Sequence, residues 1–390
     1  MKWEMKNMGD LCSLVNGKAY KASDWTDSGL PIIRIQNLND STKPFNHWNG
    51  GLERQVHIQK GDFLIAWSGT PGTSFGGHIW QGAEGVLNQH IFRVDLLNGN
   101  VNKEWLKFCV NIQLLRLIDQ AHGGVGLKHV TKGAVQSVQI PLPPLEEQKR
   151  IAGILDAADA LRAKRREALA KLDDLLQSTF LDMFGDPENK SLISTMLEDG
   201  LLKLHKDGNH GSQYPRSNEF EESGIPFLSA KCISEDGNLI HDEVQFLNEQ
   251  KARTLKIGWI EKGDVLLAHN ASVGKTILYN GEFDEALIGT SLTAFRPDNE
   301  FIESAYLLGA LRSNNFQRQL FANMGQTTRN QVPITAQRRL SFPIPPLDLQ
   351  RSFAKIVSSV EEQKAKMRKH LEQLDDLFAS LQQRAFRGDL

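Results

Sequence analysis

The chain repeats itself, and this duplication constrains its fold more than any other feature of the sequence. The segment PLPPLEEQ, which begins at Pro141, returns as PIPPLDLQ from Pro343, 202 residues later. The tetrapeptide LDDL recurs at the same offset, from Leu172 and from Leu374, so the two stretches align without a gap. Self-similarity at a fixed offset indicates an internal duplication. Two copies of one architecture are therefore expected.

The two copies extend upstream of the proline segments with more divergence. KGDFLIAWSG from Lys60 matches KGDVLLAHNA from Lys262, and SGLP in the first copy matches SGIP in the second. In the same register Leu390 corresponds to Glu188, where the second globular part begins. The arrangement is therefore expected to be pseudo-cyclic, with the helix that ends at Leu390 pointing back to the start of the first copy.

Two long helices are predicted directly after the proline segments. Proline fixes φ and disfavours helical geometry in the residue before it, so each segment ends the preceding structure. Residues Glu146–Phe184 and Asp348–Phe386 then contain no proline and are rich in helix-forming residues. At 1.5 Å per residue each helix would be roughly 58 Å long. Heptad-like apolar stripes, with Arg165, Gln363 and His370 near their middles, predict an antiparallel coiled coil; two independent helices are the alternative.

Short apolar runs separated by Gly, Asn and Asp turns fill the rest of each copy and predict mixed α+β domains. Helical stretches are expected near Glu104–Asp119 and Ile302–Leu320. We therefore predict an α+β chain with two globular domains in a pseudo-two-fold arrangement, separated by two long helices. The expected boundaries are 1–140 and 187–342 for the globular domains, and 141–186 and 343–390 for the helix regions.

Composition excludes several classes of protein. No window approaches the roughly 18 uninterrupted apolar residues that a membrane helix needs. The N-terminus lacks the pattern of a signal peptide, so a cytoplasmic location is expected. Cys12, Cys109 and Cys232 are odd in number and far apart, as expected of reduced, buried thiols. The net charge of −2 argues against a chain that grips nucleic acid without local basic loops or a partner.

Motifs for catalysis are missing from the sequence. Residues Ala271–Thr276 end in Gly-Lys-Thr, as a phosphate-binding P-loop does, but the first glycine of that motif would fall on His269. An adenine methyltransferase would need an Asn/Asp-Pro-Pro-aromatic loop, and the Pro-Pro pairs here, at Pro143 and Pro345, follow Leu and Ile. H-E-x-x-H does not occur, and the pattern G-x-S-x-G is met only by the glycine-rich stretch Gly72–Gly76. The chain is therefore predicted to be no enzyme and to bind no metal.

Side chains that read base edges and phosphates recur in loops at equivalent places of the two copies. Each one alone is as readily an ordinary polar loop residue, so the signal lies in the recurrence. The predicted DNA-contact residues of the first copy are Arg34, Gln36, Asn37, Ser68, Gly69, Thr70, Lys128 and His129. Those of the second copy are His210, Arg216, Lys231, His269, Asn270, Ser272, Lys275, Arg329 and Asn330.

The whole pattern resembles one known family. Two variable domains, each closed by P-[LI]-P-P-L-x-x-Q and a long helix, with MFGDP after the first helix and AFRGDL at the end of the second, look like the specificity subunit of Type I restriction-modification systems. The resemblance covers essentially the whole chain. It implies that each recognition domain reads one half of a bipartite, asymmetric DNA site and that the helices act as a spacer.

The resemblance also implies partners and cofactors. Two adenine methyltransferase subunits would dock on the chain, and two ATP-dependent restriction subunits can join them in defence against foreign DNA. AdoMet, ATP and Mg²⁺ would then be bound by those partners, with no cofactor in this chain and no membrane contact. Recognition loops vary by design within the family, so it implies no base specificity for single residues.

Three rival readings remain at this point. An NTP-driven enzyme would rest on Gly274-Lys275-Thr276 alone and would turn over ATP. A coiled-coil assembly scaffold would rest on the two helices and the near-neutral charge, and would show no sequence preference. The recognition subunit of a Type IIB-like restriction-modification enzyme shares the predicted architecture.

Overall fold

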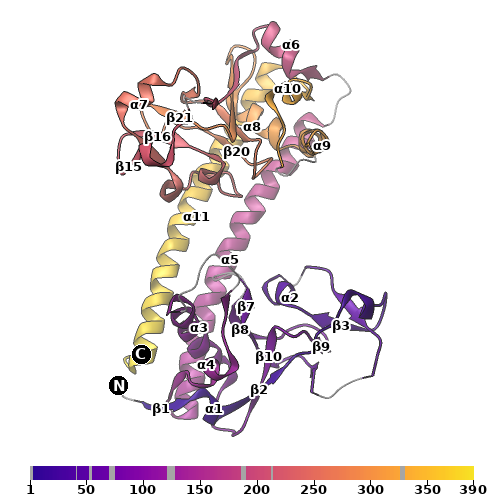
Figure 1. Ribbon diagram of the computed structural model, residues 1–390, viewed down its shortest axis with the longest axis vertical. Helices are drawn as coiled ribbons and strands as arrows, with labels where there is room; N and C mark the ends of the chain where they lie inside the picture. Colours follow the sequence, from indigo (N-terminus) through magenta and orange to yellow (C-terminus); the bar gives the residue numbers. More distant parts are fainter. Residues whose placement is uncertain are drawn as a thin grey trace. The chain divides into compact units, whose positions relative to one another are not determined.

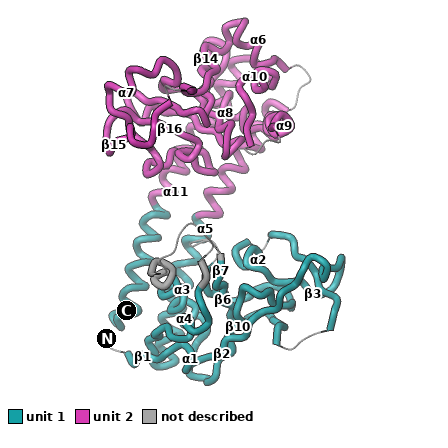
Figure 2. Tube along the Cα trace, viewed as in Figure 1, with its two compact units in different colours: residues 1–165, 370–390 teal, residues 166–369 magenta. Residues whose placement is uncertain are grey.

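The computed structural model describes residues 3–40, 42–51, 55–69, 75–120, 128–185, 190–211, 214–325 and 330–390. Two compact units are distinguished (Figure 2): unit 1 comprises residues 1–165 and 370–390, and unit 2 comprises residues 166–369. Each unit contains one globular part and a portion of each long helix. The boundaries predicted from the sequence treat the helices as separate regions and stay predictions.

A four-stranded antiparallel sheet forms the centre of each globular part (Figure 1). Equivalent strands follow one another in the same order in the two sheets. In unit 1 the order is β2-β10-β6-β8, and in unit 2 it is β14-β22-β19-β20. The strands of unit 1 are β2 (Cys12–Asn16), β10 (Ile91–Leu96), β6 (Phe63–Ala66) and β8 (Gly76–Ile79). Those of unit 2 are β14 (Leu202–Asp207), β22 (Leu292–Pro297), β19 (Val265–Ala268) and β20 (Thr276–Leu278). The duplication inferred from the sequence is therefore a duplication of fold.

The strands β6 and β19 are buried at every position, which explains their uninterrupted apolar sequences. Successive side chains of a strand point to opposite faces of its sheet. In β6, Phe63 and Ile65 therefore join one core cluster while Leu64 joins another. Each such side chain contributes about 1.5–3 kcal/mol on burial. The sheets are thus covered on both faces, and these strands hold the loops that follow them.

A second, mixed sheet lies in each globular part and shares the order of four strands, to which unit 2 adds an edge strand. In both units its two middle strands run parallel: β3 with β9 and β16 with β21. Unit 1 has the order β4 (Asn46–Trp48), β3 (Leu30–Ile33), β9 (Gly85–Leu87), β5 (His57–Ile58). Unit 2 has the order β15 (Phe220–Glu221), β17 (Gln245–Leu247), β16 (Ile225–Leu228), β21 (Ala286–Ile288), β18 (Trp259–Ile260).

Short ladders and helices complete the units. The two-stranded ladders are β1 (Glu4–Asn7) with β12 (Gln139–Leu142), β7 (Ser68–Gly69) with β11 (Lys128–His129), and β13 (Ser191–Leu192) with β23 (Ser341–Phe342). The shorter helices are α1 (Met8–Leu11), α2 (Ile35–Asn39), α3 (Lys103–Gln120), α4 (Lys132–Gln136), α6 (Ile193–Glu198), α7 (Glu249–Thr254), α8 (Ser304–Arg312), α9 (Asn314–Ala322) and α10 (Ile334–Gln337).

The second globular helix differs from its prediction because it is broken in two. The stretch expected near Ile302–Leu320 forms α8 and α9, with Ser313 between them. The hydroxyl of Ser313 accepts a hydrogen bond from the amide of Phe316, at 3.3 Å, and donates one to the carbonyl of Ala310, at 2.7 Å. Serine therefore caps the new helix, which its sequence position before Asn314 could have indicated.

The two long helices are α5 (Leu145–Phe184) and α11 (Leu347–Arg387), and they pack together as predicted (Figure 1). The end of α11 packs on the globular part of unit 1, because Phe386 stacks on Trp105 with ring centroids 5.3 Å apart. Phe184, the residue 202 positions earlier, contacts Tyr306 of unit 2 at 4.8 Å. The pseudo-cyclic connection predicted from the repeat is therefore present in the fold.

The cysteines and the hydropathy of the helices agree with the sequence. Cys12, Cys109 and Cys232 are free and buried, as expected from their number and spacing. Burial raises the pKa of each of these thiols, to about 12 for Cys12. Among the described helices, none has a run of apolar residues long enough to cross a lipid bilayer.

Candidate nucleic-acid interface

Two of the predicted loop groups lie side by side in each unit. In unit 1, β7 pairs with β11, which places Ser68 opposite His129. In unit 2, Asn270 forms an isolated bridge with Gln331. Asn270 and Gln331 lie 202 residues after Ser68 and His129, so the same pairing occurs in both copies. The loop after the buried strand and the loop before the proline segment therefore form one surface in each unit.

Backbone hydrogen bonds just inside these pairs anchor that surface. The amide of Val130 donates to the carbonyl of Trp67 at 3.1 Å, and the amide of Val332 donates to the carbonyl of His269 at 2.9 Å. Both bonds follow directly from the ends of the buried strands β6 and β19. The loops therefore begin on rigid elements.

The loop of unit 2 contains a strained turn. The amide of Ser272 donates to the carbonyl of Asn270 at 2.9 Å, so three residues close the turn, and Ala271 between them has φ 64°. A non-glycine residue in this region costs on the order of 1–3 kcal/mol, and such strain gathers at functional sites. The amide of Ala271 also donates to Asn330 at 3.1 Å, which holds the turn in place. Gly69 stands at the equivalent position of the first copy, where the conformation would be free of strain.

A hollow of about 240 Å³ opens beside this turn. Three of the residues that line it belong to the predicted contact set, namely Ser272, Lys275 and Asn330, and their chain neighbours Ala271 and Val273 line it too. Glu235 also lines it, and its carboxylate lies 2.9 Å from Lys275 Nζ. The hollow thus offers hydrogen-bond donors and acceptors on three separate loops.

The remaining predicted residues are distributed over both surface and interior. The exposed ones are Gln36, His210, Arg216, Lys231 and Asn330. The half-buried ones are Arg34, Asn270, Ser272 and Lys275. Thr70 and Arg329 lie outside the described residues, and for Gly69, Lys128 and His129 the structure describes the backbone alone.

Three predicted side chains are buried: Asn37, Ser68 and His269 have exposures of 2%, 6% and 1%. Asn37 accepts a hydrogen bond from the amide of Arg34 at 3.2 Å and donates to the carbonyl of Lys43 at 3.1 Å, so it shapes its own loop. His269 Nδ1 lies 2.8 Å from the hydroxyl of Thr293, and burial lowers its pKa. All three side chains face the interior in this structure, and the DNA contact expected of them stays a prediction.

Several predicted basic groups already have partners. His210 Nε2 lies 2.6 Å from Asp207. Arg34 donates to the side chain of Asn46 at 3.2 Å, and its guanidinium lies 5.7 Å from the ring centroid of Trp25. Trp25 is 39% exposed, and sequence reasoning did not single it out because no motif distinguishes it from a core tryptophan. An exposed aromatic ring beside an arginine is a surface on which a nucleotide base can stack.

Ion pairs between α5 and α11 were also missed. In unit 1 Arg162 Nε lies 2.5 Å from Asp375 Oδ1, and in unit 2 Lys364 Nζ lies 2.6 Å from Asp173 Oδ1. Arg162 and Lys364 are 202 residues apart, as are Asp173 and Asp375, so one pair has been copied into both units. On α5 Asp173 lies eleven residues after Arg162, and on α11 Lys364 lies eleven residues before Asp375. The two helices therefore run antiparallel. The repeat offset was the signal that could have revealed them.

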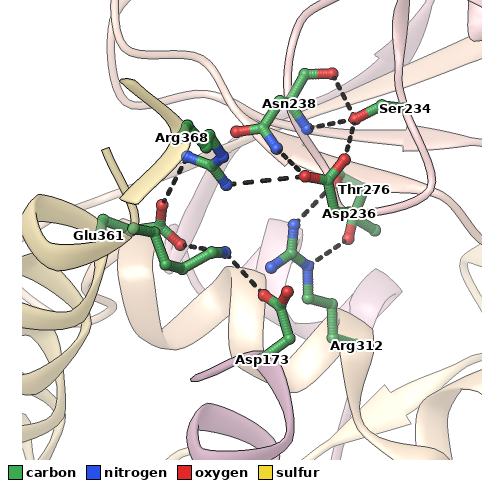
Figure 3. Close-up of polar contacts among 9 residues, drawn as sticks. Asp173, Ser234, Asp236, Asn238, Thr276, Arg312, Glu361 and Arg368 are labelled. Atoms are coloured by element: carbon green, nitrogen blue, oxygen red, sulfur yellow. Dashed lines mark hydrogen bonds and ion pairs between the residues drawn. The ribbon is translucent and has the colours of Figure 1, made fainter. Parts of the chain in front are cut away.

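The pair of unit 2 belongs to a larger network (Figure 3). Lys364 also lies 2.9 Å from Glu361, and Arg368 lies 3.7 Å from both Glu361 and Asp236. The carboxylate of Asp236 accepts hydrogen bonds from Ser234 and Asn238 of the same loop, each at 2.5 Å. This network therefore ties a loop of the globular part to helix α11 within unit 2.

Arg312 completes the network from α8. Its guanidinium donates to the hydroxyl and to the carbonyl of Thr276, both at 3.0 Å, beneath the loop that carries Asp236 (Figure 3). In unit 1 the corresponding helix position holds Asn111, whose side chain hydrogen-bonds the backbone of Gly77. In both units a side chain of the globular helix therefore hydrogen-bonds the edge strand of the central sheet. This side chain is an amide in unit 1 and a guanidinium in unit 2.

Comparison with known proteins agrees with this architecture. Residues 1–171 and 206–375 match the family described as Type I restriction modification DNA specificity domain. The MjaVIII Type I restriction enzyme specificity subunit of Methanocaldococcus jannaschii is 25% identical over 96% of this chain and 89% of its own length. The EcoBI Type I restriction enzyme specificity subunit of Escherichia coli is 20% identical over 100% of this chain and 86% of its own.

Solved structures support the fold. The S subunit of a Type I restriction-modification system from M. genitalium superposes with a TM-score of 0.53 at 17% identity, covering 99% of this chain and 96% of that one. Because the family match covers most of the chain in two segments, with one recognition domain in each, the function follows from it. The chain belongs to the specificity subunits of Type I restriction-modification systems, which recognise DNA sequence through two target recognition domains.

Proposed function

We propose that each globular part reads one half of a bipartite, asymmetric DNA site, and that α5 and α11 fix the gap between the halves. The observation that carries this proposal is the surface built twice from the same backbone pairing, Ser68 with His129 and Asn270 with Gln331. The shared pairing starts the two surfaces at equivalent places of their sheets, while their side chains differ. Two different half-sites are the consequence.

The side chains proposed to touch DNA are the ones that reach the surface. In unit 2 these are His210, Arg216, Lys231, Ser272, Lys275, Asn270 and Asn330, and in unit 1 they are Arg34 and Gln36. Asparagine and glutamine match the edge of adenine, and arginine and lysine match guanine or phosphate. The net charge of −2 means that these local groups, together with a partner, must supply the attraction to the DNA backbone.

Two adenine methyltransferase subunits are the proposed partners of the helices. Leu175 and Leu377 are 202 residues apart, and they are 49% and 50% exposed on α5 and α11. Exposed leucines at equivalent helix positions suit two copies of one partner, since each copy would bury the same apolar contact. Two ATP-dependent restriction subunits join this assembly in the proposed complete complex.

The chain itself is proposed to supply recognition without catalysis. AdoMet, ATP and Mg²⁺ belong to the partner subunits in this proposal. The P-loop-like segment supports it, because the position of the first glycine of that motif holds His269, whose side chain is 1% exposed and lies 2.8 Å from the hydroxyl of Thr293.

Methylome sequencing of a host that carries this chain and its methyltransferase tests the proposal. A single bipartite adenine-methylation motif is expected. Replacing residues 1–140 with the same segment of a relative should change one half-site only. Lys231→Ala should weaken binding by about 1–3 kcal/mol, whereas Lys262→Ala, an exposed lysine outside the proposed surface, should have no effect. Both half-sites changing together would contradict independent reading by the two parts.

A further inference from the structure

A buried glutamine joins each globular part to the long helix that follows it. Gln148 and Gln350 are the last residues of the two repeated segments P-[LI]-P-P-L-x-x-Q, and both are 0% exposed. They stand in the first turn of α5 and of α11, where a surface helix would carry a solvated side chain. Their burial in both copies calls for a structural reason.

The side-chain amide of each glutamine makes the same three hydrogen bonds. In unit 1, Gln148 accepts from the amide of Asn102 at 2.8 Å and donates to the carbonyls of Asn100 at 2.9 Å and Pro143 at 2.8 Å. In unit 2, Gln350 accepts from the amide of Glu303 at 2.9 Å. It donates to the carbonyls of Phe301 at 3.0 Å and Pro345 at 2.8 Å.

These bonds connect three parts of the chain that no ladder connects. One is the segment just before α3 or α8, one is the proline segment, and one is the long helix itself. Pro143 and Pro144, like Pro345 and Pro346, carry no amide hydrogen to donate, and the ladders of β12 and β23 end before them. The glutamine replaces that pairing and uses its carbonyl oxygen and both amide hydrogens to do so.

An aromatic side chain completes each joint from the globular helix. Trp105 of α3 donates its indole hydrogen to the carbonyl of Pro141 at 3.0 Å, and Tyr306 of α8 donates its hydroxyl to the carbonyl of Pro343 at 2.5 Å. Pro141 and Pro343 are equivalent in the repeat. Both aromatic side chains are fully buried, so each donor needs this acceptor.

We propose that Gln148 and Gln350 are positioning residues that fix the angle between each reading part and its helix, and thereby hold the gap between half-sites to one length. This inference rests on the proposed function, because it assigns the accuracy of the gap to these two joints. The helix length sets the average gap, and the stiffness of the two joints sets its spread. A loosened joint lets a reading part swing and accept sites whose gap is one base pair longer or shorter.

Gln148→Met and Gln350→Met, made in the complex with methyltransferase, test the proposal. Methionine has nearly the same shape but leaves buried backbone groups without partners. By mapping of methylated sites, we expect unchanged half-sites and an increase of about tenfold in methylation at sites with a gap one base pair off. A single gap in both variants would overturn the proposal.

Gln337→Met is the matched control. Gln337 is also 0% exposed, and it donates to the carbonyl of Val332 at 3.0 Å inside the globular part of unit 2, away from the joint. It should cost stability and leave the gap single. An equal broadening of the gap by Gln337→Met would mean general loosening and would also overturn the proposal.

A milder variant and a direct distance measurement keep the test decisive if the glutamine variants fail to assemble. Tyr306→Phe removes one hydrogen bond with almost no change of shape. Spin labels at Lys262→Cys and Lys355→Cys, both exposed in unit 2, report the distance between globular part and helix, and the three buried thiols will not label. A broader distance distribution in Tyr306→Phe supports the joint, and an unchanged one refutes it.

The two proposals fail in different ways. If the wild-type complex gives no bipartite motif, the proposed function is wrong, while the distance distribution still reports on the joint. If the wild type gives one motif and all joint variants keep its single gap, only the inference about the joint is wrong.

Discussion

The ion pair between the long helices was copied by the duplication, yet its two copies use different chemistry. In unit 1 the cation is Arg162, whose side chain is 18% exposed and lies 4.3 Å from the ring centroid of Phe378. In unit 2 it is Lys364, whose side chain is 1% exposed. Arg162 is bound by two carboxylates, those of Asp159 and Asp375, and Lys364 likewise by Glu361 and Asp173.

The difference shows that equivalent ion pairs between α5 and α11 can form both at a partly solvated position and at a buried one. Arginine is weakly hydrated and planar, so it can stack on an aromatic ring while it remains partly solvated. A lysine ammonium is a compact point charge, and burying it requires nearby carboxylates on more than one side. The network that reaches Asp236 supplies further charge balance in unit 2. We therefore expect unit 2 to depend on its ion pair more strongly than unit 1.

The largest expected effect is that of Lys364→Met. It leaves Asp173 without its cation and Glu361 with Arg368 alone, and because both carboxylates are partly exposed, the free energy of unfolding of unit 2 should fall by about 3 kcal/mol, the low end for a broken buried pair. Arg162→Met should lower that of unit 1 by about 1–2 kcal/mol. Hydrogen exchange of each unit in the complex would measure both values. Equal losses of unfolding free energy in the two units would contradict the stronger dependence expected of unit 2.

Acid should act on both units through one histidine in each, the buried His205 of unit 2 and the half-buried His78 of unit 1. Burial lowers the pKa of His205 in unit 2 and of His78 in unit 1 to about 4. The unfolded chain binds a proton at each below pH 6.5, which the folded protein resists. Each contribution is therefore complete above pH 6.5 and lost as the pH falls toward 4, by about 3 kcal/mol per histidine.

The measurement is the free energy of unfolding between pH 7 and pH 4. His205→Gln should flatten the pH dependence of unit 2 alone, and His78→Gln that of unit 1 alone. If the free energy of unfolding still falls with pH equally in both variants, carboxylates rather than these histidines cause the acid sensitivity.

A smaller effect is expected from exchanging the two cations. Arg162→Lys keeps the charge but loses the stacking on Phe378 and the planar fork, which should cost about 1 kcal/mol. Lys364→Arg adds volume in a buried site and should cost about 1–3 kcal/mol. Denaturation of the two variants would compare these costs. If both exchanges were neutral, charge alone would explain the pairs and their different surroundings would be irrelevant.

The smallest effect, and the control for all of these, is that of Lys171→Met. Lys171 lies 2.7 Å from Glu167 on the outside of α5, and both side chains are well exposed. Solvent screens such a pair, so no change in stability beyond experimental error is expected. A loss comparable to that of Arg162→Met would show that any ion pair on these helices matters, whatever its burial.

The equivalence of the two candidate surfaces could be predicted because the duplication marks it. Ser68 and Asn270, each following a buried strand, occupy equivalent positions in the repeat, and the structure adds that they pair with equivalent partners. Whether a polar loop side chain faces water or the interior does not follow from its type. His269 and Asn37 are buried because the packing of neighbouring strands and turns offers them hydrogen bonds, and no local pattern records that.

The sequence by itself determined the duplication, the two long helices with their ends, the α+β class and the family, because helix propensity, proline and a constant offset are local or repetitive signals. Only the tertiary structure decided which polar residues are buried. Gln148, Gln350 and Lys364 look like surface residues of a helix by their type, and they are buried because partners from distant segments satisfy them. Burial of a polar group is decided by the hydrogen bonds and charges that folding brings to it, which are properties of the assembled chain.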